Sequence, residues 1–398
     1  MELYVHIPFC VRKCRYCDFI SFPAQEAFRE RYVDHLLREA ALRSAALPAP
    51  LRSVETVYIG GGTPSLLPPP LFSRLVQGLK THFDFSAVSE FTVEANPGTV
   101  TAPWAEAILR LGVTRVSLGM QAAQPHILQT LGRIHLFEDV SRSVSLLRSA
   151  GLKNLSLDLM FGIPRQTLGD WQDTLTQALS LFPSHISAYG LIPEEGTPLY
   201  NDLAAGVCSL PDPELERGMY EEALSRLAMH GFKQYEISNF ALPGCSCRHN
   251  IGYWTQEPYL GLGLSAASMF PLALLHPETR YEKGFPCLRQ KNPIGIEAYE
   301  KMILSDSDAG ADQFRESERI GAKDACFETL MLGLRMNAGV SSSFFRRLHG
   351  LSLEDIYGPR LKKLAAQGLL FHDPVHDSWR LTRRGMDLQN AVLVELMD

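Results

Sequence analysis

The strongest constraint on the fold is a regular alternation between short β-branched apolar runs and longer amphipathic segments. The short runs predict buried strands at Leu3–Ile7, Val54–Ile59, Phe91–Glu94, Arg115–Leu118, Leu155–Leu159 and His185–Tyr189, with a weaker seventh at Tyr235–Ile237. The longer segments predict helices at Phe28–Ala46, Leu71–His82, Ala102–Leu111, Asp139–Ala150, Leu168–Leu181 and Pro213–His230. Alternating strands and helices form parallel β–α–β units, so we expect an α/β barrel, complete or open, over residues 1–240.

The alternation stops after residue 240. Residues 241–300 are rich in Gly, Pro and aromatic residues and show no clear period, so we treat them as a separate linking segment. In residues 301–398 a helix is expected at Leu361–Gln367, ended by Gly368, before a hairpin of Leu369–His372 and Trp379–Thr382. Helices followed by a hairpin predict a small winged-helix-like domain, which we expect to serve packing or protein contacts.

The charge balance argues against nucleic-acid binding. The chain has 38 Lys and Arg against 44 Asp and Glu, a net charge of −6, whereas a general binder of nucleic acids or anionic membranes would be basic. A hydrophobic content of 45% excludes disorder for most of the chain. No run approaches the roughly 18 apolar residues of a membrane span, and the first residues do not resemble a secretory signal. We therefore expect a cytoplasmic protein, and a membrane-associated partner stays open.

Chemically capable residues follow the predicted strands in order. They are Cys10, Cys14 and Cys17 after the first strand, Gly60–Pro64 after the second, Glu94 and Asn96 at the third, Gln121 after the fourth and Asp158 at the fifth. Because the carboxyl ends of parallel strands meet at one face, these residues predict one site there. The glycine run could bind a carboxylate or phosphate, or it could simply form a turn. The polar side chains could bind a ribose or an amine, or they could be satisfied buried groups.

The cysteines form a Cys-x3-Cys-x2-Cys motif, the most specific signal in the chain. Thiolates are soft ligands that suit zinc and iron–sulfur clusters. Three thiolates leave one iron of a cubane cluster open to a small molecule. Zinc would need a fourth ligand, and the neighbouring His6 and Asp18 are poor candidates. The motif therefore favours an iron–sulfur cluster.

A second cluster lies in the linking segment. It consists of Cys245, Cys247, His249, Asn250, Tyr253 and Trp254. Zinc is one interpretation, although only three soft ligands lie close together in the sequence. Haem is another, because His or Cys can ligate its iron and aromatic rings can cover the macrocycle. The third is a loop with ordinary packing aromatics.

The ordered motif set resembles the radical S-adenosylmethionine proteins related to oxygen-independent coproporphyrinogen III oxidase. The resemblance covers nearly the whole chain and rests on the cysteine motif with Tyr4–Phe9, Gly60–Pro64, Val93–Pro97, Ser117–Gln121 and Asp158–Pro164. It implies an open (βα)6 barrel and a 4Fe-4S cluster on Cys10, Cys14 and Cys17, whose free iron holds S-adenosylmethionine. Carried over by motif, Tyr4 and Tyr16 would flank the cluster, and Gly61, Gly62 and Thr63 would bind the methionine end. Glu94, Gln121, Arg133 and Asp158 would bind further around the cofactor.

Two departures from the oxidase point to the HemW-type branch of this group, whose members act as haem chaperones. The oxidase has a further cysteine where this chain has Phe19, and it has a long segment before the first strand that we do not find here. The string His249–Trp254 matches the haem-associated motif of that branch, with His249 as the expected haem ligand and Cys247 as its rival. The resemblance thus implies haem as cargo and apo-haemoproteins as acceptors. The alternatives are the radical decarboxylation of coproporphyrinogen III and a redox-sensing protein that never cleaves the cofactor.

Overall fold

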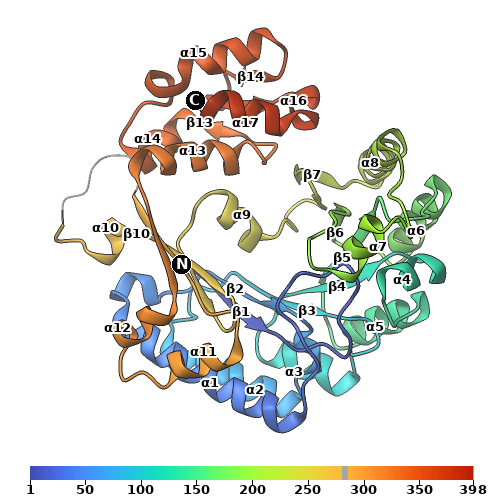
Figure 1. Ribbon diagram of the computed structural model, residues 1–398, viewed down its shortest axis with the longest axis vertical. Coiled ribbons are helices and arrows are strands. Elements are labelled where there is room, and N and C mark those ends of the chain that lie inside the picture. Colours follow the sequence, from blue (N-terminus) through green and yellow to red (C-terminus); the bar gives the residue numbers. More distant parts are fainter. Residues whose placement is uncertain (280–285, 398) are drawn as a thin grey trace.

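Six parallel strands form the centre of one large open sheet (Figure 1). The computed structural model describes residues 1–279 and 286–397. The central strands pair in chain order, and they are β1 (Glu2–Ile7), β2 (Thr56–Gly61), β3 (Glu90–Ala95), β4 (Arg115–Gln121), β5 (Asn154–Phe161) and β6 (His185–Gly190). All six strands expected from the apolar runs are therefore confirmed.

Helices return the chain from each strand to the next along the outer side of the sheet (Figure 1). They are α1 (Glu26–Ala46), α2 (Pro69–His82), α3 (Ala102–Arg110), α4 (Pro125–Leu131), α5 (Phe137–Ser149), α6 (Leu168–Ser180), α7 (Pro198–Ala204) and α8 (Pro213–Met229). The six expected helices are confirmed within about two residues at each end. Short α4 and α7 were not expected, since seven residues are too few to show a helical period.

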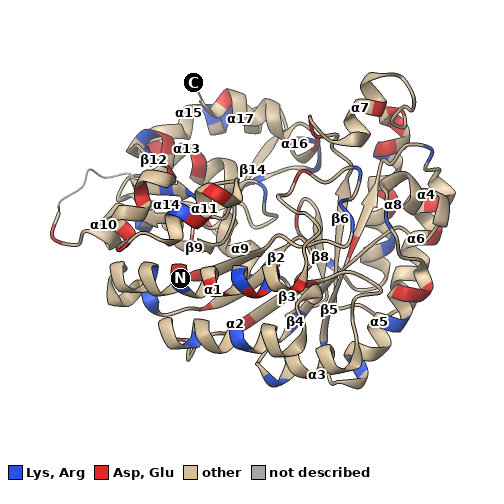
Figure 2. Cartoon of the chain, turned by 60° about the horizontal axis from the view of Figure 1, so that its bottom comes forward, with Lys and Arg blue, Asp and Glu red and all other residues tan. Residues whose placement is uncertain are grey.

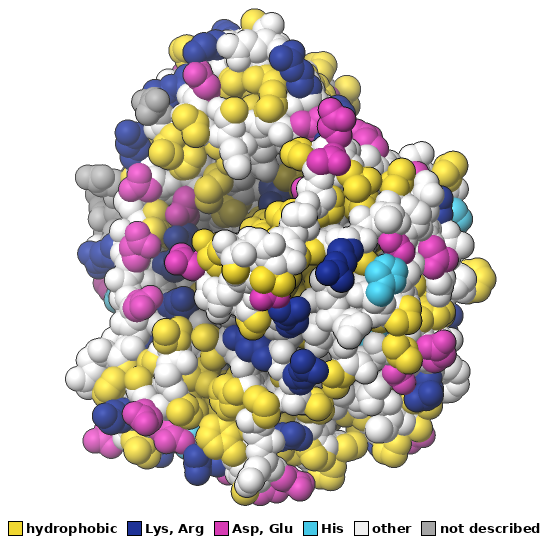
Figure 3. All heavy atoms as spheres, turned by 45° about the vertical axis from the view of Figure 1, so that its right-hand side comes forward, with side chains coloured by type: hydrophobic (Ala, Val, Ile, Leu, Met, Phe, Trp, Pro, Cys, Tyr) yellow, Lys and Arg dark blue, Asp and Glu magenta, His cyan; other side chains and the backbone are white. Residues whose placement is uncertain are grey.

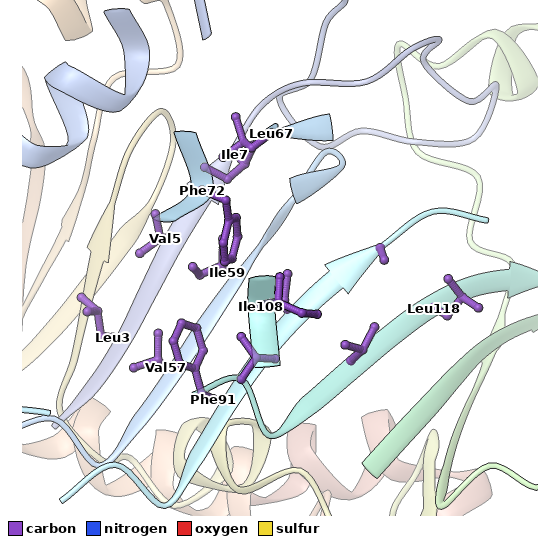
Figure 4. Packing of buried hydrophobic residues seen from close by; sticks show 14 of the residues in the cluster. Leu3, Val5, Ile7, Val57, Ile59, Leu67, Phe72, Phe91, Ile108 and Leu118 are labelled. Atoms are coloured by element: carbon purple, nitrogen blue, oxygen red, sulfur yellow. The ribbon is translucent and has the colours of Figure 1, made fainter. Parts of the chain in front are cut away.

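Strand alternation divides the side chains of β1 between two faces. Leu3, Val5 and Ile7 point to the helix side, where they pack with Ile59 and Phe72 (Figure 4). The intervening residues of β1 therefore point to the concave side. Because both faces of the central strands are buried, they read as continuous apolar runs with occasional polar residues on the inner face. Those inner polar residues are the ones that build the site.

Further short strands extend both edges of the sheet. On one edge, β6 pairs antiparallel with β8 (Asn239–Ala241), which pairs with β7 (Lys233–Glu236). The weaker seventh strand expected at Tyr235–Ile237 overlaps β7. It is not a seventh parallel unit, because β8 lies between β7 and β6 and pairs antiparallel with both. The sheet ends at β7 on this side and stays open.

On the other edge, the segment 241–300 supplies most of the extension. β9 (Tyr259–Leu262) pairs parallel with β1, and β10 (Ala267–Pro271), β11 (Cys287–Lys291) and β12 (Glu316–Ile320) continue antiparallel. The segment also holds α9 (Arg248–Trp254), α10 (Leu272–Leu275) and α11 (Ile296–Ile303), with α12 (Asp308–Ala311) after it. It is thus an integral part of the sheet, and its short elements explain the missing period.

The C-terminal part forms a separate apolar cluster and has the element order of a winged helix. The order is α13 (Ala322–Gly333), β13 (Val340–Ser341), α14 (Ser342–His349), α15 (Leu353–Ala366), β14 (Leu370–Asp373) and β15 (Ser378–Leu381), followed by α16 (Arg383–Asp387) and α17 (Gln389–Met397). The expected hairpin is confirmed as β14 and β15, within one residue at each end. Met302, Ile303 and Ala311 pack with the main core and not with this C-terminal cluster. The domain boundary that we expect at residue 301 stays a prediction.

Charged residues of both signs are interspersed along the outer helices (Figure 2). Such mixing agrees with the modest net charge of −6. Among the described residues, no helix combines the length and the apolar composition needed to cross a membrane.

Candidate functional site

A cavity of about 370 Å³ opens at the carboxyl ends of the central strands. We call it the strand-end cavity. It brings together ten of the thirteen residues predicted for the cluster and for cofactor or haem binding: Cys10, Cys14, Tyr16, Cys17, Gly61, Gly62, Glu94, Gln121, Arg133 and Asp158. Residues separated by about 150 positions in the chain thus share one space, as expected for the ends of parallel strands.

The loop that holds the cysteines is tied down at its base and its middle. A short bridge closes the base, where the amide of Cys10 donates to Phe22 O at 3.1 Å. In the middle, the amide of Arg15 donates to Leu131 O at 3.0 Å, and the Arg15 guanidinium pairs with Asp202 of α7. These tethers hold the thiol-bearing residues over the strand ends without regular secondary structure in the loop.

The three thiols are free and line the same cavity. Cys14 Sγ accepts a hydrogen bond from Arg133 Nη1 at 3.5 Å, and Cys10 Sγ lies 3.6 Å from Thr63 Oγ1. Burial raises the pKa of the Cys17 thiol to about 11. Within residues 1–279 and 286–397, no three His, Cys, Asp or Glu side chains converge closely enough to hold a metal ion. The donor set is therefore chemically suitable for soft metals but is not gathered into a ligand cage.

Arg133 connects the cysteine loop to the ends of two strands. Its Nη2 donates to Asn96 Oδ1 at 2.8 Å and to Gly119 O at 2.7 Å. Asn96 Nδ2 in turn donates to Thr63 Oγ1 at 2.6 Å. Arg133 Nε is buried and has no hydrogen-bond partner. A buried guanidinium donor of this kind is suited to a ligand that carries an oxygen acceptor.

Two buried carboxyl groups face the cavity and both are hydrogen-bonded. Glu94 accepts from the Tyr58 hydroxyl at 2.7 Å and from the Gly61 amide at 2.9 Å. Asp158 accepts from the hydroxyls of Ser117 at 2.9 Å and Ser187 at 2.8 Å. Burial raises the pKa of both groups, that of Glu94 to about 7. A ligand that carries a positive charge or a hydroxyl group would stabilise the ionised forms of Glu94 and Asp158.

Gln121 has a backbone conformation that side chains rarely adopt. Its φ is 65°, in the left-handed region, at the end of β4 where the pairing with β5 slips. Such strain in a residue other than glycine clusters at binding sites, because it aims a side chain where regular strand geometry would not. It places Gln121 in the wall of the strand-end cavity.

The two cavity glycines are required for different reasons. Gly61 has a φ of +109°, whereas Gly62 is outside the positive-φ region. A Cβ on Gly62 would lie 2.7 Å from Phe9 O and 2.9 Å from Ile7 O. A side chain there would thus push against the end of β1 and the backbone after it.

A second and larger cavity, of about 550 Å³, lies beside the first. We call it the aromatic pocket. Its walls come from β1, β2, α9, the strands β9–β11 and helix α13 of the C-terminal part. The space-filling view shows hydrophobic side chains around a hollow below the C-terminal part (Figure 3). Phe19, Tyr58, Gly61, Glu94 and Asn250 line both cavities, so the two are adjacent.

His249 is buried in the wall of the aromatic pocket, and both of its ring nitrogens are engaged. Nδ1 lies 2.7 Å from Thr56 Oγ1, and Nε2 lies 3.0 Å from the Tyr253 hydroxyl. The ring stacks on Tyr58 with centroids 5.2 Å apart. Burial, with a smaller effect of Arg115, lowers the pKa of His249 to about 3, so the imidazole is neutral. In the tautomer that donates from Nδ1, the lone pair on Nε2 accepts from Tyr253.

Cys247 faces away from both cavities. Its thiol donates to Glu90 Oε1 at 3.3 Å, and Glu90 also accepts from the amides of Arg248 and His249. Burial raises the pKa of the Cys247 thiol to about 12. Cys247 is thus the residue before α9, whose first amides are capped by Glu90, and it does not line the aromatic pocket.

Two further predicted residues lie outside the strand-end cavity. Tyr4 lines the aromatic pocket, where its hydroxyl lies 3.0 Å from His6 Nδ1. Thr63 lines a small separate pocket that also includes Cys14 and Arg133. Sequence reasoning missed Tyr58, Arg115, Ser117 and Ser187, although polar residues inside apolar strands were a usable signal. It also missed the far wall of the aromatic pocket, formed by Tyr259, Met269, Arg289, Glu328 and Leu332.

Comparison with known families matches both parts of the chain. Residues 4–178 match the radical SAM superfamily, and residues 320–388 match the HemN C-terminal domain. Among solved structures, coproporphyrinogen III oxidase (HemN) from Escherichia coli covers 99% of this chain with a TM-score of 0.80, over 89% of its own length and at 22% identity. That similarity supports the open fold and its C-terminal domain.

Curated relatives match over almost the entire chain. Heme chaperone HemW from Bacillus subtilis is 35% identical, with 98% of this chain and 97% of the relative covered. Its namesake from Escherichia coli is also 35% identical, covering 99% and 97%. The mouse mitochondrial radical S-adenosyl methionine domain-containing protein 1 is 32% identical, covering 99% and 87%. Because these identities extend over both parts of the chain, the protein belongs to the HemW family of the radical S-adenosylmethionine superfamily.

Proposed function

We propose that the protein is a haem chaperone of the cytoplasm, which binds haem and transfers it to apo-haemoproteins. The observation that supports this most is the aromatic pocket, whose volume of about 550 Å³ lies in the range of sites for large organic ligands. Its walls contain Tyr4, Tyr58, Tyr253, Tyr259 and Trp254, whose rings offer flat apolar surface to a porphyrin. The curated relatives carry the same function in their names.

The proposal includes a 4Fe-4S cluster on Cys10, Cys14 and Cys17, as the superfamily implies. The donor set fits, since three thiols line one cavity and a buried guanidinium lies beside Cys14. Cluster binding would require the three sulfurs to come together, and the loop that carries them has no regular secondary structure to prevent it. When bound, the cluster would supply an iron with an open position and electrons for reductive chemistry.

The remaining cavity residues suit S-adenosylmethionine. The carboxylates of Glu94 and Asp158 can accept from an amine or from ribose hydroxyls, and Gln121 offers an amide. The free Nε of Arg133 can donate to the ligand's carboxylate. Gly61 and Gly62 contribute backbone to one wall of the cavity, and a Cβ on either would press on neighbouring protein atoms. Thr63 and Tyr4 would act less directly, Thr63 through Asn96 and Tyr4 by stacking on Tyr58 at 6.2 Å.

We assign the haem iron to His249. The contact of Nδ1 with Thr56 fixes the ring and leaves the lone pair on Nε2, which is the arrangement usual for a ligating histidine. Nε2 can reach iron once the Tyr253 hydroxyl moves away. Ligation would thus exchange one hydrogen bond for one coordinate bond. This exchange suits a protein that must release its cargo again.

The test combines haem titration with product analysis. Purified chain, with and without anaerobically reconstituted cluster, is titrated with haem and then mixed with an apo-haemoprotein. We expect haem binding and transfer, and no protoporphyrinogen when reductant, S-adenosylmethionine and coproporphyrinogen III are supplied. Formation of protoporphyrinogen would instead establish the oxidase, whereas binding of neither haem nor substrate, with no 5′-deoxyadenosine, would leave the redox sensor.

A further inference from the structure

The aromatic pocket contains one cationic side chain at its far wall. Arg289, on β11, is the only Lys or Arg that lines the pocket in the described part of the chain. Its side chain is 36% exposed, so it is accessible from solvent. The other charged residues of the pocket are Glu94 and Glu328, both acids. A ligand that carries its own carboxylate would therefore find a single complementary charge there.

Arg289 is already paired with a carboxylate from another part of the molecule. Its Nη2 donates to Glu328 Oε2 at 2.8 Å, and Glu328 lies on α13 of the C-terminal part. Glu318 on β12 is farther, with 3.9 Å from Nη1 to Oε2, and it does not line the pocket. The Arg289–Glu328 pair thus joins the sheet extension to the winged-helix part in the wall of the pocket.

We propose that Arg289 binds a carboxylate of the tetrapyrrole cargo, and that Glu328 occupies the guanidinium when no cargo is bound. The inference rests on the proposed function, because it places a carboxylated macrocycle in the aromatic pocket. Guanidinium and carboxylate match in geometry, so one carboxylate replaces another without loss of hydrogen-bond pattern. The ion pair is partly open to solvent, with 36% of the Arg289 side chain and 15% of the Glu328 side chain exposed, so a carboxylate that enters from solvent can compete for the guanidinium.

The exchange would also connect cargo binding to the C-terminal part. When a cargo carboxylate takes Arg289, Glu328 loses its partner on the sheet, and α13 loses that polar contact with β11. Leu332, one turn further along α13, lines the same pocket and would then meet the macrocycle directly. The winged-helix part would thereby respond to whether the pocket is filled.

The experiment compares haem with haem dimethyl ester, in which both carboxylates are blocked. Full-length wild-type chain, Arg289→Leu and Glu328→Gln are titrated with each ligand. We expect Arg289→Leu to lower the affinity for haem about tenfold or more, because a charge-assisted hydrogen bond is lost. The affinity for the ester should stay unchanged. Glu328→Gln should raise the affinity for haem several-fold, since the carboxylate that competes for Arg289 is gone. The affinity for the ester should not change.

Matched controls make the outcome unambiguous. Glu318→Gln removes a nearby acid that does not line the pocket and should change neither affinity. Melting temperatures identify any variant that fails to fold, and Arg289→Lys, which keeps the charge, should recover part of the affinity for haem. Equal losses for haem and ester in Arg289→Leu, or weaker haem binding in Glu328→Gln, would overturn the inference. If wild type binds neither ligand, the proposed function itself fails.

Discussion

The strand-end cavity and the aromatic pocket are neighbours, but they are built in different ways. The strand-end cavity takes its residues from the ends of successive parallel strands and the loops after them, so chain order and spatial order agree. The aromatic pocket combines β1 with α9, the added strands and helix α13, which are far apart in the chain. A site of the first kind follows from local motifs, whereas one of the second kind exists only after the sheet edge and the C-terminal part have assembled.

The largest expected effect concerns the strand-end cavity. Changing Cys10, Cys14 and Cys17 together to Ala should abolish iron–sulfur binding, because no other thiols line that cavity among the described residues. Iron and sulfide analysis after anaerobic reconstitution measures it, and the protein should stay colourless. The aromatic pocket should still bind haem if the two cavities act separately. Stoichiometric iron and sulfide in the triple variant would refute the assignment.

Glu94 lines both cavities, and its titration is a second test. Its pKa is raised to about 7 in the fold, so the folded state holds a proton that the unfolded state releases near pH 4.5. The contribution of Glu94 to the free energy of unfolding is therefore largest below about pH 4.5 and is lost as the pH rises to about 7. The total change from this group is about 3 kcal/mol. Glu94→Gln should flatten this pH dependence in denaturant unfolding of the cofactor-free chain. An unchanged slope would show that Glu94 titrates normally.

A pair of variants in α9 sharpens the role of the aromatic pocket. His249→Ala should lower the affinity for haem about tenfold to a hundredfold, and it should change the absorption spectrum of the bound haem, since the iron loses a ligand. Tyr253→Phe removes the hydroxyl bound to Nε2 and should strengthen haem binding several-fold with the same spectrum. Cys247→Ser, outside the pocket, serves as the control. If Tyr253→Phe loses haem binding while His249→Ala binds haem as the wild type does, the ligand is the phenolate of Tyr253.

The smallest effect tests how α9 is held against the sheet. A Cβ on Gly252 would collide with the Glu2 carboxyl, so Gly252→Ala should lower the free energy of unfolding by about 1–3 kcal/mol. Gly295→Ala is the matched control, because a Cβ there meets nothing within 4 Å. Chemical denaturation of both variants measures the difference. Equal stabilities would mean that α9 can shift away from β1 without cost.

Much of the fold and of the first cavity could be predicted because its signals are local. A buried parallel strand shows as an apolar run, and the residues after it must lie at its carboxyl end. The failures share one cause, since β9 and β10 are short, and β9 pairs with β1 more than 250 residues away in the chain. No periodicity within such a segment reveals its distant partner.

By itself, the sequence determined the open α/β barrel, the winged-helix order at the end and the group of residues around the cysteine loop. Only the tertiary structure decided what surrounds His249, and which of its neighbours line a cavity. The Cys247 thiol donates to Glu90, at the start of β3, and does not line the pocket. The hydroxyls of Thr56 and Tyr253 contact the two ring nitrogens of His249. Arg289 and Glu328 meet because the sheet edge and the C-terminal helix pack together. The physical reason is that strand order follows from local hydrophobic pattern, whereas side-chain partners depend on packing between segments distant in the chain.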